Sequence, residues 1–105
     1  MRKAGSQFQL RWFLLPLVLW FAGCASAPVQ EMSDARQAIE AARAAGADRF
    51  AEDLMAEANG LLRQAEVELE RGDYRSARRA ALTAREQAMT AREVAEHSVS
   101  AVDPP

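Results

Sequence analysis

Hydrophobic and polar residues follow a helical spacing along this chain, and the pattern is sharpest between residues 49 and 97. Apolar residues repeat every seven positions in two series before Gly72, and alanines do so in two series after it. Such paired series are typical of the a and d positions of packed helices. The series are Ala51, Ala58 and Ala65 with Met55, Leu62 and Leu69, and then Ala77, Ala84 and Ala91 with Ala81, Ala88 and Ala95. The pattern predicts helices at about 49–71 and 74–97.

The dipeptide Gly72-Asp73 separates the two predicted helices. Glycine commonly ends a helix in the left-handed conformation, and aspartate commonly caps the next helix. So short a turn makes the two helices antiparallel neighbours, with Met55 opposite Ala91 and Ala58 opposite Ala88. Because every layer of the hairpin contains an alanine, we expect the two helices to approach closely.

A third helix is predicted before the hairpin, at about 31–45. Its apolar residues recur at spacings of three and four, Gly46 ends it, and Asp48 is a candidate N-cap for the following helix. The apolar residues are Met32, Ala35, Ile39 and Ala42. We expect this helix to cover the apolar flank of the hairpin, which is formed by Leu54, Leu61 and Val94. The fold class predicted is all-α, an antiparallel three-helix bundle with coiled-coil-like packing.

The opposite flank of the predicted hairpin is charged. Glutamates on the first helix face arginines on the second, so that Glu66 is expected to pair with Arg78 and Glu52 with Arg92. Exposed ion pairs contribute only ~0.2–1 kcal/mol each. We therefore expect them to set the register of the helices more than their stability.

The first residues resemble a bacterial lipoprotein signal. A basic segment at 1–11 precedes eleven apolar residues at 12–22, too few to span a bilayer as a helix, and the motif Phe21-Ala22-Gly23-Cys24 resembles a lipobox. The resemblance implies that residues 1–23 are a removed signal peptide, that Cys24 is lipidated (a palmitate-bearing N-terminus), and that 24–30 form a tether. An uncleaved anchor, or ordinary secretion with cleavage after residues 25–27, are the alternatives. Because no aspartate follows Cys24, the sorting rule of enteric bacteria favours the outer membrane, facing the periplasm.

Charge and composition exclude several functions. Three of the 13 basic residues and none of the 15 acidic ones precede Cys24, so the chain from Cys24 on has a net charge of −5, which disfavours nucleic-acid binding. A lone cysteine permits no internal disulfide and no thiolate metal cluster. His97 has no second ligand at metal spacing, and we expect it to be an exposed cation near a helix end. No catalytic signature occurs, so we expect no enzyme, no cofactor and no metal site.

Arginines gather at the predicted hairpin turn. Arg71 suits the end of a helix, but Arg75, Arg78 and Arg79 lie at the positive start of the next one. They are candidate contacts for an anion or partner, such as a lipid headgroup, the cell wall or an acidic protein. The alternative is pairing with glutamates across the turn.

The helical part as a whole resembles the domain-of-unknown-function 4398 family of bacterial lipoproteins. The matching stretches are 38–48, 58–69 and Gly72-Asp73-Tyr74 with Ala77-Arg78, whereas residues 51–53 replace a turn that often contains proline in the family. The resemblance implies a small helical domain, here 31–97 followed by a disordered tail at 98–105, and no activity. We expect a lipid-anchored structural or adaptor protein of the cell envelope, with a protein partner or self-association. The alternative is a periplasmic binding module that uses its helical groove or basic hairpin tip.

Overall fold

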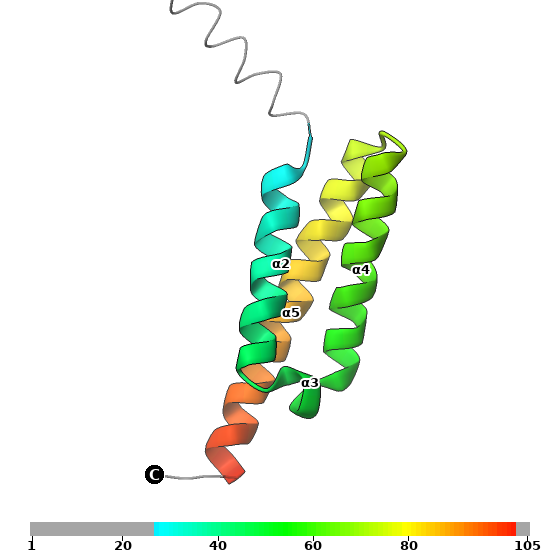
Figure 1. Ribbon diagram of the computed structural model, residues 1–105. Helices are drawn as coiled ribbons and strands as arrows, with labels where there is room; N and C mark the ends of the chain where they lie inside the picture. Colours follow the sequence, from blue (N-terminus) through cyan, green and yellow to red (C-terminus); the bar gives the residue numbers. More distant parts are fainter. Residues whose placement is uncertain (1–26, 103–105) are drawn as a thin grey trace, which may run out of the picture.

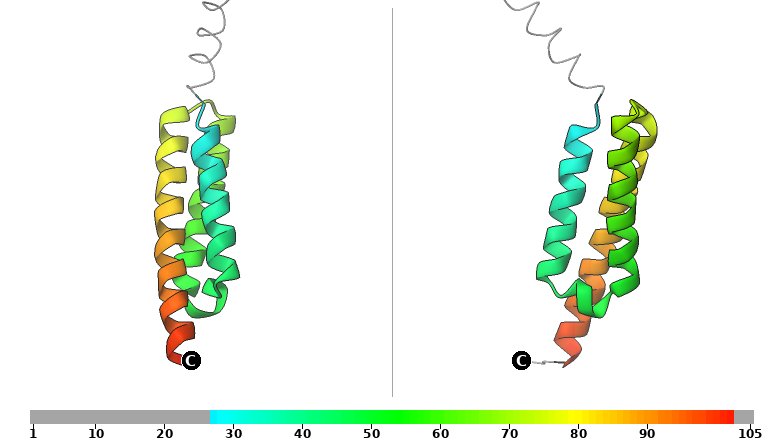
Figure 2. Two further views of the ribbon diagram at one scale, coloured as in Figure 1. Left: turned by 90° about the vertical axis from the view of Figure 1, so that its left-hand side faces the viewer. Right: turned by 45° about the vertical axis from the view of Figure 1, so that its right-hand side comes forward.

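The computed structural model describes residues 27–102, and all regular structure in that range is helical (Figure 1). The helices are α2 (Val29–Ala44), α3 (Ala47–Phe50), α4 (Glu52–Glu70) and α5 (Tyr74–Val102). The three long helices run side by side in alternating directions, and the single turn of α3 links α2 to α4 at one end (Figure 2). The predicted all-α bundle is confirmed.

Both predicted glycine helix ends are present. Gly46 has φ +95° and Gly72 has φ +80°, a left-handed conformation that glycine adopts without a steric cost. After Gly72, the Asp73 side chain accepts a hydrogen bond from the backbone N–H of Ser76 (3.4 Å), which caps the start of α5 as expected. The chain therefore reverses at the two places where the sequence predicts it.

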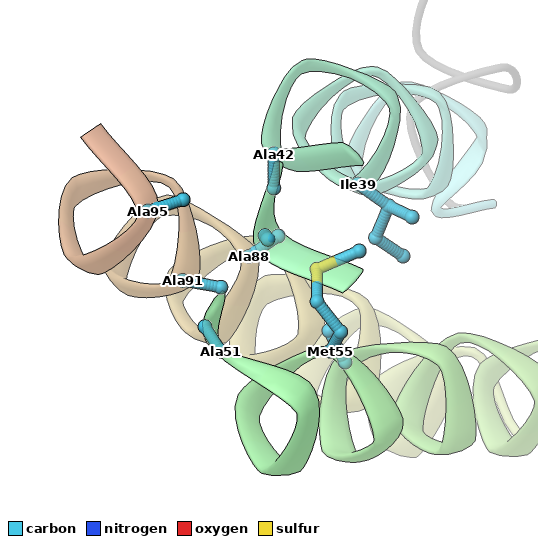
Figure 3. Packing of buried hydrophobic residues seen from close by; sticks show 9 residues of the cluster. Ile39, Ala42, Ala51, Met55, Ala88, Ala91 and Ala95 are labelled. Carbon is cyan, nitrogen blue, oxygen red and sulfur yellow. The ribbon is translucent and has the colours of Figure 1, made fainter. Parts of the chain in front are cut away.

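The core is built almost entirely from alanine. Thirteen of the sixteen buried hydrophobic residues within 27–102 are alanines, and the others are Met32, Ile39 and Met55. Figure 3 shows Met55 of α4 reaching toward Ile39 of α2, with alanines of α5 beside it. The pairs Met55–Ala91 and Ala58–Ala88 belong to one cluster, as the heptad register predicts.

The second predicted helix is not continuous. Ala51 has φ −145° and ψ 51°, which interrupts the helix between α3 and α4. This break lets both Ala47 and Ala51 be buried against the core. Asp48 consequently lies inside α3, where its carboxylate pairs with Arg43 at 3.0 Å, and it does not cap α4. The break falls at the place where the sequence departs from the family's proline-containing turn.

Two predicted boundaries are also corrected. Helix α2 begins at Val29 after a buried Pro28, so the last two residues of the tether predicted at 24–30 are helical. Helix α5 continues to Val102, so residues 98–102 of the predicted tail are helical as well. No glycine or proline occurs between Gly72 and Pro104, and the side-chain hydroxyl of Ser98 donates a hydrogen bond to the backbone carbonyl of Val94 within the helix (2.8 Å). Nothing in the sequence therefore stops the helix at residue 97.

Helix α2 covers the charged flank of the α4–α5 hairpin, and the prediction that it covers the apolar flank is wrong. Arg36 of α2 pairs with Glu66 of α4 at 3.3 Å, and Glu31 of α2 pairs with Arg78 of α5 at 3.1 Å. The apolar residues of α2 pack against the buried alanines of the hairpin from this charged side. The other flank, which carries Leu54, Leu61 and Val94, is left without a covering helix, and Val94 is 38% exposed.

Replacing Gly60 by alanine is expected to stabilise the bundle by about 0.5–1 kcal/mol, because this glycine lies within α4 and a Cβ there meets only the end of the Arg63 side chain, at 4.0 Å. Urea unfolding followed by circular dichroism measures the change. Gly72→Ala is the matched control: it also has open space, but its φ of +80° should make the substitution destabilising. Equal effects of the two substitutions would contradict this account.

Candidate functional site

The predicted lipidation site lies outside the described residues. Cys24 precedes Ala27, where the description begins, so its modification stays a prediction. Within residues 27–102, no helix combines the length and the apolar character needed to cross a membrane. In the described part, the candidate contact residues lie on two surfaces, the arginine-rich end of the bundle and the flank that α2 leaves open.

The arginine-rich end consists of the α4–α5 turn and the first turns of α5. Arg71, Arg75 and Arg79 are exposed there, and so is every residue from 70 to 75. The start of α2 lies at the same end, while α3 and the end of α5 lie at the other (Figure 2). The structure thus places Arg75 and Arg79, two of the three predicted contact residues, on a surface next to the start of α2.

Arg78, the third predicted contact residue, has a structural role. Its Nε donates to Glu31 Oε1 at 3.1 Å, and the two side chains are only 35% and 29% exposed. Because Glu31 belongs to the first turns of α2, this pair fixes the start of α2 to the start of α5. Glu66, which the hairpin register pairs with Arg78, binds Arg36 of α2 at 3.3 Å, and the register does not predict that pair.

The uncovered flank is formed by α3, α4 and α5 and carries two open grooves. One open groove of about 540 Å³ is lined by Phe50, Leu54 and Val94 among others, and a smaller one of about 220 Å³ by Leu61, Glu68 and Arg79 among others. Glu68 Oε1 accepts a hydrogen bond from Gln64 at 3.3 Å. Its other oxygen, Oε2, is buried and has no hydrogen-bond partner within the described part of the chain.

Sequence reasoning found the residues of this flank but assigned them to the core. The signal it missed is the charge on α2: Glu31 and Arg36 complement Arg78 and Glu66, which lie on the opposite flank. Placing α2 over the charged flank satisfies both pairs at once. The apolar residues of the other flank are then available to a partner.

The remaining titratable residues form no metal site. No three histidine, cysteine, aspartate or glutamate side chains of residues 27–102 are grouped so as to hold a metal ion. His97 is exposed, as expected, and its Nδ1 lies 2.9 Å from the backbone oxygen of Glu93 in its own helix. Because α5 continues to Val102, however, His97 does not lie in the last turn.

The fold and these surfaces define a small, alanine-cored three-helix protein whose binding surfaces are open. The chain belongs to the family described as Domain of unknown function (DUF4398), which it matches over residues 30–102. That match spans α2 to α5, so the whole described bundle is the family's domain. No curated protein and no solved structure matches the chain.

The ion pair between Glu31 and Arg78 is expected to contribute about 0.2–1 kcal/mol, since both side chains are partly exposed. A double-mutant cycle with Glu31→Gln and Arg78→Gln, measured by urea unfolding, gives this coupling free energy. Arg75→Gln removes the same charge from the same end and should leave the free energy of unfolding nearly unchanged. A coupling of zero, or an equal loss from Arg75→Gln, would show that Arg78 does not hold α2 in place.

Proposed function

We propose that this protein is a lipid-anchored adaptor of the bacterial cell envelope, held in the outer membrane by Cys24 and facing the periplasm. In this proposal residues 1–23 direct export and are removed, and the three-helix domain presents its uncovered flank to a protein partner. The partner's helix lies along α4 and α5 in the place that α2 leaves open. No catalysis is involved.

The membrane part of the proposal is supported by the sequence around Cys24. The basic segment, the apolar run of eleven residues and the small residues Ala22 and Gly23 precede the only cysteine of the chain. A cysteine linked to diacylglycerol carries two acyl chains, which is enough for stable anchoring. The resemblance of residues 21–24 to a lipobox therefore accounts for an otherwise unpaired cysteine in an exported protein.

The adaptor part is carried by one observation, the uncovered flank. Leu54 and Leu61 are partly buried and Val94 is 38% exposed, so their apolar surface is not completely removed from water. Glu68, which lines the smaller groove together with Leu61, has a buried Oε2 with no hydrogen-bond partner among residues 27–102, and a buried acceptor is costly unless it is hydrogen-bonded. A partner that supplies an apolar helix face and one donor near Glu68 satisfies both features.

The alternative function is a periplasmic binding module that recognises an envelope ligand (cell wall, lipid headgroup or protein) through its helical groove or basic hairpin tip. A groove that surrounds a small ligand has less support from the geometry. The grooves of the described residues are open depressions, and an alanine core leaves no enclosed space in which a small ligand could be surrounded. An extended protein surface suits such shallow grooves better. The partner class that we propose is therefore another helical protein.

Replacing Cys24 by serine is expected to abolish palmitate labelling and to leave the signal peptide attached, because the thiol is the atom that receives the lipid. Labelling in cells and the mass of the purified protein measure the two effects. Ser26→Ala, two residues on, should change neither. If the Cys24→Ser protein still matures to the normal size, the chain is secreted by ordinary cleavage and the anchor does not exist.

A photo-crosslinking amino acid at Leu61 is expected to capture a partner of one fixed mass in cells, because this side chain lies in the uncovered flank. The same amino acid at Val67, which is 45% exposed on α4 and does not line the grooves, is the control and should give no such adduct. An adduct of twice the protein's own mass would assign the flank to a second copy. The absence of any adduct at Leu61 would contradict the adaptor proposal.

A further inference from the structure

We propose that the arginine-rich end of the bundle, formed by Arg71, Arg75 and Arg79, binds the anionic phospholipid headgroups of the membrane that holds Cys24. The domain then stands with its long axis away from the membrane and this end against it. The inference rests on the lipid anchor proposed above and adds a second contact with the same membrane. It also leaves the larger groove of the uncovered flank, which Phe50, Leu54 and Val94 line, free for a partner, whereas Arg79 borders the smaller groove.

The topology brings this end to the membrane. The start of α2 and the α4–α5 turn lie at the same end of the bundle (Figure 2). Pro28 comes four positions after Cys24, and four residues of fully extended chain span at most about 14 Å. Helix α2 is fixed to α5 by the pair of Glu31 with Arg78 at 3.1 Å. A lipid on Cys24 therefore holds the exposed arginines of the turn within a short distance of the headgroups.

The distribution of charge along the bundle favours the same orientation. The half nearer the turn, residues 27–36 and 61–87, contains seven basic and seven acidic residues. The other half, residues 37–60 and 88–102, contains three basic and seven acidic residues. The exposed surface at the turn, residues 70–75 and 79, holds three arginines and two acidic residues, Glu70 and Asp73. The fourth arginine of this end, Arg78, is paired with Glu31. An anionic surface attracts the turn and repels the far half, so the domain is turned with the arginines toward the membrane.

Two further features of the turn suit a phosphate-rich interface. The start of α5 directs the positive end of the helix dipole outward beside Arg75. Tyr74, the first residue of α5, is 40% exposed, and a tyrosine combines an apolar ring with a polar hydroxyl, as residues at membrane interfaces commonly do. The arginines, the helix start and Tyr74 all lie on one exposed surface, residues 70–75 and 79.

The test uses the full protein purified from membranes with its acyl chains and reconstituted into vesicles of phosphatidylcholine, with or without phosphatidylglycerol. We expect backbone amide exchange of residues 70–79 to slow by about fivefold when phosphatidylglycerol is present, and this effect to disappear at high salt. Arg75→Ala with Arg79→Ala should abolish it. Arg49→Ala with Arg63→Ala removes the same charge from exposed positions elsewhere and should preserve it. Exchange in the alanine core reports whether each variant is folded.

The outcomes separate this inference from the proposed function. The mass of the purified protein shows whether it is acylated, and a protein without acyl chains overturns the anchor and this inference together. An acylated protein whose turn exchanges equally in both kinds of vesicle overturns this inference alone. Protection by phosphatidylglycerol that survives the loss of Arg75 and Arg79 overturns the assignment of the contact to these arginines.

Discussion

Alanine side chains determine how this bundle packs. Along α5, the residues buried between α2 and α4 are all alanines, and their small size lets the helix backbones approach closely. An alanine buries little apolar surface, so the stability of the bundle depends on many contacts between closely spaced atoms. Within residues 27–102 no charged or polar residue is buried as a whole, so the charged residues lie on the ends and flanks of the bundle, where the candidate contact surfaces are.

The alanine seam does not by itself determine which flank of the hairpin α2 covers. A stripe such as Met32, Ala35, Ile39 and Ala42 can pack into the seam from either side. Electrostatics favours one of them, because Glu31 reaches Arg78 and Arg36 reaches Glu66 only from the charged flank. Each pair is weak alone, but both would be lost if α2 packed on the other side. Charge thus selects the arrangement, and the arrangement leaves Leu54, Leu61 and Val94 uncovered.

Most of the fold could be predicted from the sequence because local patterns of residues determine it. The heptads, Gly46, Gly72 and Asp73 give the helices, two turns and the buried residues. The break at Ala51 could not be predicted, since alanine favours a helix and its non-helical backbone comes from burial of Ala47 and Ala51 together. The candidate site could likewise be predicted only in part from the sequence. The exposed arginines of the turn follow from spacing, but the role of Arg78 depends on Glu31, 47 residues away.

In the arrangement that we propose, helix α2 also determines which end of the bundle faces the membrane. In the α4–α5 hairpin alone, the chain would enter at the end opposite the arginine-rich turn. One more antiparallel helix reverses the chain once more, so it enters beside that turn. Glu31 of the same helix pairs with Arg78 and thereby fixes the start of α2 to α5. A lipid placed just before α2 therefore acts on the basic end of the domain, and the acidic end and the uncovered flank extend toward whatever lies beyond the membrane.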